Sequence, residues 1–303
     1  MLALWTAVRL LGLEAGYPLV PLMAFTPYVA IVAIIVAVVA GLVRQLVPAA
    51  VALIAFAVLA ATILPRAFSN GVSAPPDGAP LKVMTANLEF GDSDAEGVVE
   101  LVREEEPDVL AVQELTPDAA QELRRAGLLE ELPERRLPEP GATGNGLYSR
   151  YPLHAAGTEA TSSAGFVVPR AIIRVPGGRS VEVVSVHAAP PRAGEVDQWE
   201  SDLRSLPGAT PAGILRLLAG DFNATLDHAE LREVLDSGYV DAADADGQAL
   251  TPTWPVGRII PPPLTVDHLL ADERIAVEGV SVHDLPGSDH KAVSAELVLP
   301  GAA

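Results

Sequence analysis

Two long stretches near the N-terminus contain no charged residue, and they constrain the fold more than any other feature. Residues 15–43 and 45–65 are uncharged runs of 29 and 21 residues. Each exceeds the roughly 20 residues that an α-helix needs to cross the hydrocarbon core of a bilayer. Prolines interrupt the first run as far as Pro27, so its spanning helix is expected to begin there. The pattern predicts two membrane-spanning helices, with residues 1–13 as an interfacial helix or part of a third span.

Charge is distributed unevenly along the chain. Residues 1–66 contain three arginines and one glutamate and have a net charge of +2. Because the whole chain has a net charge of −19, residues 67–303 have a net charge of −21. Half of the residues are hydrophobic and none is cysteine, which excludes a disordered chain, a disulfide scaffold and a cysteine-ligated zinc site. We predict a membrane anchor over residues 1–66, a linker rich in proline, glycine and serine over residues 67–80, and an acidic globular domain over residues 81–303.

Positive charges indicate the orientation of the anchor. Arg44 lies in the short turn between the two spans, and positively charged short loops favour the cytoplasm. The predicted location is therefore the cell membrane with an extracytoplasmic domain, although Arg66 favours the opposite orientation. A buried hairpin in a soluble domain fits less well, because two uncharged helices without a polar face suit lipid. A cleavable signal peptide is disfavoured because the apolar content far exceeds one short apolar segment.

The acidic domain opens with a strand–helix–strand pattern. Residues 81–87 alternate like a strand, apolar positions within residues 98–102 indicate a helix ending before Pro107, and residues 108–114 form a short apolar strand. Further strands are predicted at residues 171–175, 181–187, 214–219, 264–270 and 292–299. Parallel strands mixed with a hairpin predict an α/β sandwich and not a doubly wound nucleotide-binding sheet.

Polar side chains gather where these strands are expected to begin or end. They are Asn87, Glu114, His187, Asp221, Asn223, Asp267, Asp289 and His290. Oxygen ligands and histidines without cysteine are the groups that a hard cation such as Mg²⁺ and a phosphoryl oxygen require. Each position alone has an ordinary explanation in a turn or a cap, but together they indicate a catalytic site. We expect His268 in the core and His154, His228 and His283 at the surface.

The order of these motifs resembles that of the endonuclease/exonuclease/phosphatase superfamily, the DNase I-like metal-dependent phosphoesterases. The resemblance spans residues 81–299 and rests on Thr85-Ala86-Asn87-Leu88, Val112-Gln113-Glu114, Leu147-Tyr148-Ser149-Arg150-Tyr151-Pro152, Val184-Ser185-Val186-His187, Gly220-Asp221-Phe222-Asn223, Val266-Asp267-His268-Leu269-Leu270 and Gly287-Ser288-Asp289-His290. It implies a four-layer α/β sandwich, preceded here by transmembrane helices, with the site at one edge of two packed sheets. Lys291-Ala292 replaces the usual Arg-Pro, which is expected to alter an edge turn and not the chemistry.

The resemblance implies a Mg²⁺-dependent phosphoric ester hydrolase. Asn87, Glu114 and Asp289 would hold the divalent metal, with Mn²⁺ as a possible substitute. His290 would act as the general base for an in-line water or would stabilise charge on the phosphate. Asp267 would orient the His290 ring, since a carboxylate fixes the tautomer of an imidazole and stabilises its charged form.

The remaining motif residues would bind the reacting groups. By the resemblance, Asp221 and Asn223 would position the water and the phosphoryl oxygen, and His187 would hydrogen-bond to the phosphate. Together with the metal ligands, these residues predict metal-assisted hydrolysis of a phosphodiester or a phosphomonoester.

The sequence leaves the substrate open among a lipid headgroup, a small phosphodiester and a nucleic acid. Tight duplex binding needs clustered lysine and arginine, and the charge of −21 after residue 66 disfavours it. The predicted partners are a phosphoester substrate and the lipid bilayer, and no protein partner is implied. An extracytoplasmic nuclease and a non-catalytic binding module on the same fold are the alternatives.

Overall fold

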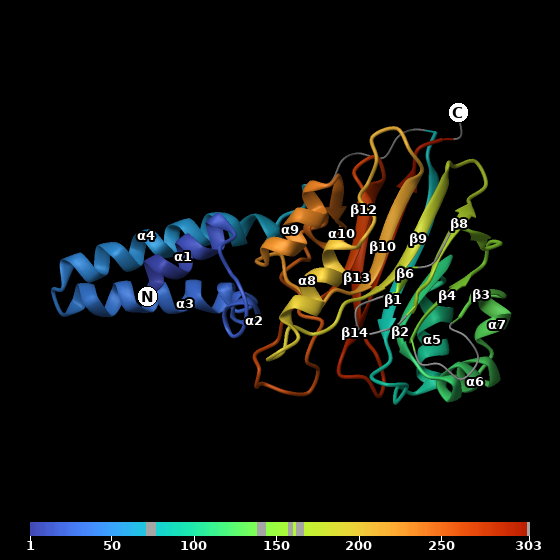
Figure 1. Cartoon of the computed structure of the whole chain (residues 1–303), viewed down its shortest axis with the longest axis horizontal. Coiled ribbons are helices and arrows are strands. Elements are labelled where there is room, and N and C mark those ends of the chain that lie inside the picture. The colour runs from blue at the N-terminus through green and yellow to red at the C-terminus, as the bar shows by residue number, and fades with distance from the viewer. Residues whose placement is uncertain (71–76, 138–143, 157–159, 162–166, 302–303) are drawn as a thin grey trace.

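A computed structural model shows an N-terminal helical segment attached to a layered α/β domain (Figure 1). It describes residues 1–70, 77–137, 144–156, 160–161 and 167–301. Residues 71–76 of the predicted linker lie outside the described residues.

The N-terminal segment is a helical hairpin with two shorter helices beside it. The hairpin consists of α3 (Thr26–Leu42) and α4 (Leu46–Ile63), which continues into the 3₁₀ turn η1 (Leu64–Ala67). The short helix α1 (Leu2–Leu11) packs along α4, and α2 (Leu19–Met23) lies at the end of the hairpin nearest the domain (Figure 1). The helix expected to begin near Pro27 therefore starts one residue earlier.

The hairpin presents apolar side chains on its outer surface. Ile31, Ile35 and Ile54 are each more than half exposed. One helix, Leu46–Ala67, is long and apolar enough to cross a membrane by length and composition, and α3 is shorter with 17 residues. Exposed apolar surface of this extent marks an interaction surface in a folded protein.

Two six-stranded mixed sheets form the centre of the α/β domain. Their strand orders are β13-β14-β1-β2-β4-β3 and β11-β12-β10-β9-β8-β5, and β6 and β7 form a separate two-stranded sheet. The strands are β1 (Ala79–Asn87), β2 (Val109–Leu115), β3 (Glu134–Arg136), β4 (Gly144–Ser149), β5 (His154–Ala155), β6 (Ala160–Thr161), β7 (Val167–Val168), β8 (Arg170–Arg174), β9 (Ser180–His187), β10 (Leu215–Asp221), β11 (Tyr239–Asp241), β12 (Asp267–Asp272), β13 (Ala276–Asp284) and β14 (Lys291–Leu299).

Helices cover the outer face of each sheet, so the domain has four layers (Figure 1). The six helices are α5 (Ala95–Glu105), α6 (Pro117–Arg125) and α7 (Leu128–Glu131) on the first sheet, and α8 (Val196–Arg204), α9 (Ala229–Asp236) and α10 (Ala242–Ala245) on the second. One large apolar cluster lies between the sheets and another beneath α5, α6 and α7. The predicted α/β sandwich is confirmed.

Five of the predicted strands begin within one residue of the predicted position, and two begin farther away. β1 starts at Ala79, two residues early, because Ala79 pairs with Leu299 of β14. β12 starts at Asp267, three residues late, because Leu264 pairs instead with Trp254 in an isolated bridge. Local apolar patterning could not show either pairing, since each partner lies outside the apolar run that predicted the strand.

The expectation of surface positions for three histidines is correct only for His154, which is exposed. His228 is 1% exposed, and its Nε2 atom lies 3.0 Å from the carbonyl oxygen of Val20. His283 is partly buried, with its Nε2 atom 3.4 Å from a carboxylate oxygen of Glu105. His228 is buried because the N-terminal segment packs over this part of the domain.

A buried carboxylate joins the N-terminal segment to the α/β domain. The Nε atom of Arg9 donates to Asp227 at 3.0 Å, and the two terminal nitrogens of Arg66 donate to it at 2.9 and 2.8 Å. Burial raises the pKa of the Asp227 carboxyl, but the guanidinium groups of Arg66 and Arg9 outweigh this and hold the pKa below its usual value. Arg66 is therefore committed to a structural ion pair.

We predict that Asp227→Asn destabilises the full chain by about 3 kcal/mol or more, because removing one partner of a buried ion pair leaves the other charges uncompensated. Thermal unfolding in detergent micelles would measure the loss. Asp236→Asn is the matched control, since Asp236 is exposed at the end of α9. Equal stability of the two variants would contradict a structural role for the Asp227 ion pairs.

Candidate active site

The predicted site residues come from strand ends that meet at one edge of the sandwich. β1 and β2 are parallel in the first sheet, as are β9 and β10 in the second, so each pair ends on the same side. β12 and β14 run antiparallel to these strands and begin at the same edge. This edge holds Asn87, Glu114, His187, Asp221, Asn223, Asp267, Asp289 and His290.

Asp221 lies at the centre of this group. The register of the second sheet places it directly between His187 on β9 and Asp267 on β12. Gly220 precedes it with a φ of 156°, and a Cβ atom there would collide with the backbone carbonyl of Val186. Only glycine allows β10 to approach β9 this closely, so the glycine sets the position of the Asp221 carboxylate.

A bulge in β2 directs Glu114 into the site. The pairing of β2 with β4 shifts between Val112 and Leu115, and Glu114 has a φ of 54°. Its carboxylate accepts hydrogen bonds from Asn87 Nδ2 at 3.2 Å and from the Phe90 backbone N–H at 2.7 Å. A strained backbone at a bulge is common where a strand must aim a side chain at a site.

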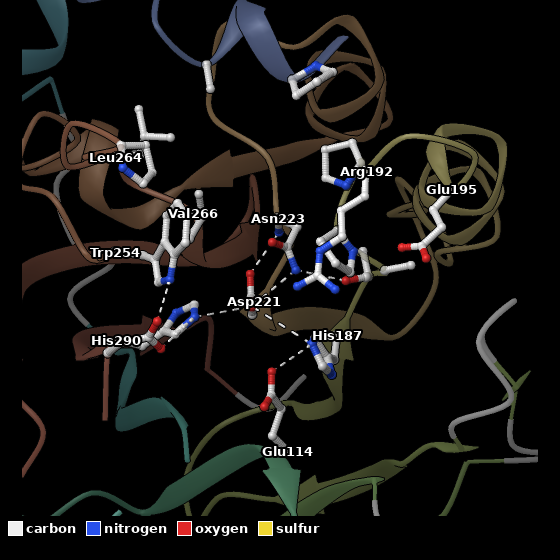
Figure 2. A pocket seen from close by; sticks show the side chains of 18 of the residues that line it. Glu114, His187, Arg192, Glu195, Asp221, Asn223, Trp254, Leu264, Val266 and His290 are labelled. Carbon is white, nitrogen blue, oxygen red and sulfur yellow. Dashed lines mark hydrogen bonds and ion pairs between the residues drawn. The ribbon is translucent and has the colours of Figure 1, made fainter. Parts of the chain in front are cut away.

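The amide of Asn87 links carboxylates from the two sheets. It donates to Glu114 and also to Asp221, whose Oδ2 atom lies 3.1 Å from Asn87 Nδ2. The Nε2 atom of His187 lies 3.5 Å from Glu114 and 3.9 Å from Asp221 (Figure 2). Asn223 donates its backbone N–H to Asp221 at 2.8 Å. These contacts hold the ends of β1, β2, β9 and β10 together around the site.

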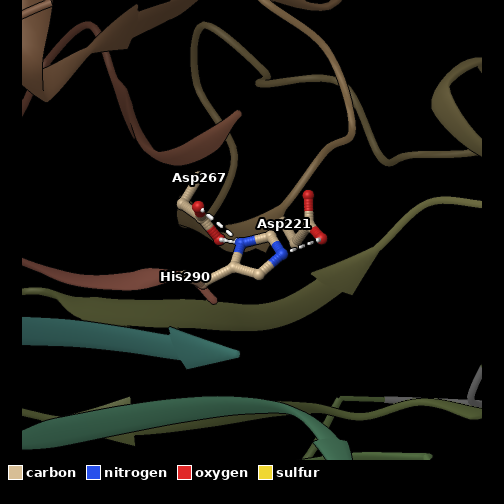
Figure 3. A group of neighbouring side chains, drawn as sticks. All are labelled: Asp221, Asp267 and His290. Atoms are coloured by element: carbon tan, nitrogen blue, oxygen red, sulfur yellow. Dashed lines mark hydrogen bonds and ion pairs between the residues drawn. The ribbon is translucent and has the colours of Figure 1, made fainter. Parts of the chain in front are cut away.

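His290 is oriented by a carboxylate on one ring nitrogen. Its Nδ1 atom lies 2.9 Å from Asp267, and its Nε2 atom lies 3.8 Å from Asp221 (Figure 3). The Nε2 atom also lies 3.8 Å from Asp289. Burial lowers the pKa of His290, but the charges of Asp267 and Asp221 outweigh burial and raise it. Because Asp267 occupies Nδ1, Nε2 is the nitrogen that can face a reacting group.

Burial also raises the pKa of the Asp221 carboxyl, and the neighbouring Asp267 raises it further while His290 lowers it. Asp221, Asp267 and His290 each offer an atom within 4.8 Å of the others, so this group could hold a metal ion (Figure 3). The hydrogen bond between His290 Nδ1 and Asp267 already explains why these two side chains are in contact without a metal ion.

The predicted metal ligands offer a second set of donors. Asn87 and Glu114 are in contact, and Asp289 lines the same cavity as Glu114. Carboxylate oxygens are donors that Mg²⁺ prefers, so Glu114 and Asp289 suit a divalent cation. The Oδ1 atom of Asn87 accepts from the Glu89 backbone N–H at 3.0 Å, so Asn87 would offer this oxygen to a metal only with its amide turned over.

Three supporting residues were missed by sequence reasoning. Trp254 Nε1 donates to the Asp289 carboxylate at 3.0 Å, and Glu89 accepts from the Asp289 backbone N–H at 2.7 Å. The Ser288 hydroxyl accepts from the His290 backbone N–H at 3.0 Å. Ser288 lies within a recognised motif and Glu89 directly follows one, so both could have been found, whereas nothing local points to Trp254.

The site opens into a cavity of about 630 Å³ (Figure 2). Polar side chains that include Glu114, His187, Asp221, Asn223 and His290 line one part of it. Residues of the N-terminal segment, Pro21, Ala24 and Phe25, also line it. The cavity therefore lies between the α/β domain and the helical segment.

Two mixed sheets covered by helices, with these side chains at one edge, define a DNase I-like α/β fold. The chain belongs to the Endonuclease/Exonuclease/phosphatase family, whose family model matches residues 84–290. Among curated protein sequences the comparison finds no match.

Solved structures share this fold. An endonuclease/exonuclease/phosphatase from Beutenbergia cavernae DSM 12333 is 20% identical with a TM-score of 0.57, over 74% of this chain and 72% of that one. D. rerio TDP2 complexed with a single-strand DNA product is 16% identical with a TM-score of 0.56, over 72% and 98%. A Bacteroides vulgatus family member is 17% identical with a TM-score of 0.54, over 73% and 99%. At these identities the likeness establishes the fold alone.

We predict that Mg²⁺ or Mn²⁺ raises the midpoint of thermal unfolding of the wild-type chain, because a ligand that prefers the folded state stabilises it. Glu114→Gln should abolish most of this rise, since it replaces a carboxylate ligand with a neutral amide. Glu122→Gln, an exposed position on α6, is the control and should keep the rise. An undiminished rise in Glu114→Gln would show that Glu114 is not a ligand.

Proposed function

We propose that the chain is a membrane-anchored, divalent-metal-dependent phosphoesterase that uses an in-line attack of water. The observation that carries this proposal is the His290–Asp267 pair, which faces Asp221 beside the Asn87–Glu114 contact. An oriented imidazole next to a cluster of oxygen donors is the arrangement that metal-assisted hydrolysis requires. Family membership supports hydrolysis of a phosphoester.

Asn87, Glu114 and Asp289 would hold the metal, which we take to be Mg²⁺ with Mn²⁺ as a substitute. When bound, the metal would supply positive charge that polarises a phosphoryl oxygen and offsets the negative charge of the transition state. Trp254 fixes the Asp289 carboxylate through its indole N–H, so that this donor stays aimed at the site.

The chain's own residues would bind the phosphate, orient the attacking water and move a proton. Asp221 and Asn223 position the attacking water and the phosphoryl oxygen, and His187 donates a hydrogen bond to the phosphate. His290 would take a proton from the attacking water at Nε2, while Asp267 holds the ring through Nδ1. The water oxygen forms the new P–O bond, the bond to the leaving alcohol breaks, and the alcohol takes up a proton from the solvent.

The exposed apolar hairpin supports the proposed anchor. The start of α3 and the end of α4 lie nearest the α/β domain, and the turn between the two helices, residues 43–45, lies farthest from it (Figure 1). A cytoplasmic Arg44 would place the catalytic domain on the opposite side of the membrane. We therefore propose a cell-membrane location with an extracytoplasmic catalytic domain.

The full chain is expected to stay in the membrane pellet after an alkaline wash and to be released only by detergent. The reason is that the outer surface of the hairpin is apolar all round, which suits lipid and not water. Immunoblotting of the two fractions measures the partition, with a peripheral membrane protein as the control. Recovery in the wash would contradict the anchor while leaving the catalytic proposal intact.

His290→Ala should lower the rate of phosphodiester hydrolysis about 10²–10⁴-fold, the usual contribution of a general acid–base group. Mg²⁺-dependent release of nitrophenol from bis(4-nitrophenyl) phosphate by the full chain in detergent measures it. His154→Ala, an exposed position, is the control. EDTA should abolish the wild-type rate.

Other outcomes of this assay would overturn parts of the proposal. A near-wild-type rate for His290→Ala would remove its catalytic role. Faster turnover of a DNA oligonucleotide than of other phosphodiesters would favour the nuclease alternative. No turnover by a folded chain that binds metal would favour a binding module.

A further inference from the structure

We propose that the substrate is a phospholipid, and that the wall formed by Pro21, Ala24 and Phe25 binds its acyl part while the catalytic residues bind its phosphate. This wall is called the anchor wall below. The inference rests on the proposed phosphoesterase function and adds the class of substrate to it. The anchor wall comes from the N-terminal segment, so it is a feature of this chain outside the matched family region.

The cavity has two chemically different sides. In Figure 2 the N-terminal ribbon, in blue, lies across the cavity from Asp221 and His290. The cavity is also lined by the apolar side chains of Pro261, Leu264 and Val266. Ala24, Leu264 and Val266 form one apolar cluster against which Phe25 packs. A ligand that fills this cavity must therefore be polar at one end and apolar at the other.

The anchor wall is continuous with the surface that we place in the bilayer. Phe25 directly precedes α3, whose outward side chains Ile31 and Ile35 are each 55% exposed. The hydroxyl of Tyr28, on the first turn of α3, donates to the Pro263 carbonyl at 2.7 Å. An acyl chain lying beside α3 could therefore reach the anchor wall without entering water, which avoids the cost of exposing apolar surface.

A loop at the rim of the cavity carries the side chains expected of a membrane contact. Ile259 and Ile260 are 84% and 83% exposed, and they stand between Arg258 and Pro261, which both line the cavity. Two adjacent exposed isoleucines are costly in water but suit the apolar edge of a bilayer. Tyr28 ties this loop to the start of α3 through Pro263, which keeps it at the level where the helix enters lipid.

The charges of the cavity fit one phosphate better than a polymer of phosphates. Arg192 and Arg258 are the arginines in its lining, and neither forms an ion pair with another residue in the described part of the chain. Acidic side chains outnumber these two arginines in the lining, which contains Glu89, Glu114, Glu195, Asp221 and Asp289. A nucleic acid needs a row of cations along its backbone, whereas a phospholipid presents a single phosphate next to its acyl chains.

The test compares acylated and deacylated forms of the same headgroups. The full chain in mixed detergent micelles would receive phosphatidylcholine, phosphatidylethanolamine, phosphatidylglycerol and phosphatidylinositol, and separately the four corresponding glycerophosphodiesters. We expect kcat/KM for at least one phospholipid to exceed that for its deacylated partner at least tenfold. Equal or higher values for all deacylated partners, or a preference for a single-stranded DNA oligonucleotide, would overturn the inference.

Phe25→Asn should lower kcat/KM for the preferred phospholipid about tenfold, mainly through a higher KM, and leave the deacylated partner unchanged. Leu22→Asn is the control, because Leu22 is an exposed residue of the neighbouring helix α2 and does not line the cavity. A loss on both substrates would indicate a folding defect. In that event the double variant Ile259→Ser, Ile260→Ser, on the exposed loop, tests the inference instead. We expect it to lower the rate on the phospholipid, and an unchanged rate would overturn the inference.

Failure of this inference is distinguishable from failure of the proposed function. Hydrolysis of bis(4-nitrophenyl) phosphate that depends on His290 supports the phosphoesterase whatever its preference between lipids and soluble diesters. If that activity is present and no phospholipid is preferred, only the lipid inference falls. If His290-dependent activity is absent on every substrate, both fall together.

Discussion

The carboxylate of Asp227 holds the two ends of the apolar hairpin against the α/β domain. Arg9 precedes the hairpin and Arg66 follows it, and both donate to this one buried side chain. The chain therefore leaves the surface of the α/β domain after Arg9, forms the hairpin, and returns to Asp227 at Arg66. Pro21 and Phe25 of the anchor wall lie between these two arginines in the sequence. The position of the anchor wall over the cavity therefore depends on the ion pairs with Asp227.

The electrostatics of the site follow from the sheet register. Asp221 and Asp267 are direct neighbours on β10 and β12, and the start of β14 brings His290 beside them. Two carboxylates this close would repel each other, and the hydrogen bond that His290 makes to Asp267 offsets part of that repulsion. The Asn87 amide does the same between Glu114 and Asp221 by donating to both. In both cases a hydrogen-bond donor, the His290 ring or the Asn87 amide, lies between two carboxylates of the site.

The sequence predicted those parts of the fold and site that depend on local patterns. The strand ends carrying Asn87, Glu114 and Asp221 are marked by short motifs beside apolar runs, and the structure brings them together. Trp254 and Phe25 were not found, because their roles depend on packing between segments far apart in the chain. His228 was assigned to the surface for the same reason, since only tertiary packing shows that Val20 covers it.

The short stretch from Asn223 to Asp227 has a mechanical consequence. Its first residue bonds to Asp221 in the site, and its last is gripped by the arginines that flank the hairpin. Hydrophobic helices tilt when the thickness of the surrounding bilayer changes. In a membrane-inserted chain such a tilt would pull on the end of β10 through only a few covalently linked residues. The geometry of the reacting groups would then depend on the lipid composition around the hairpin.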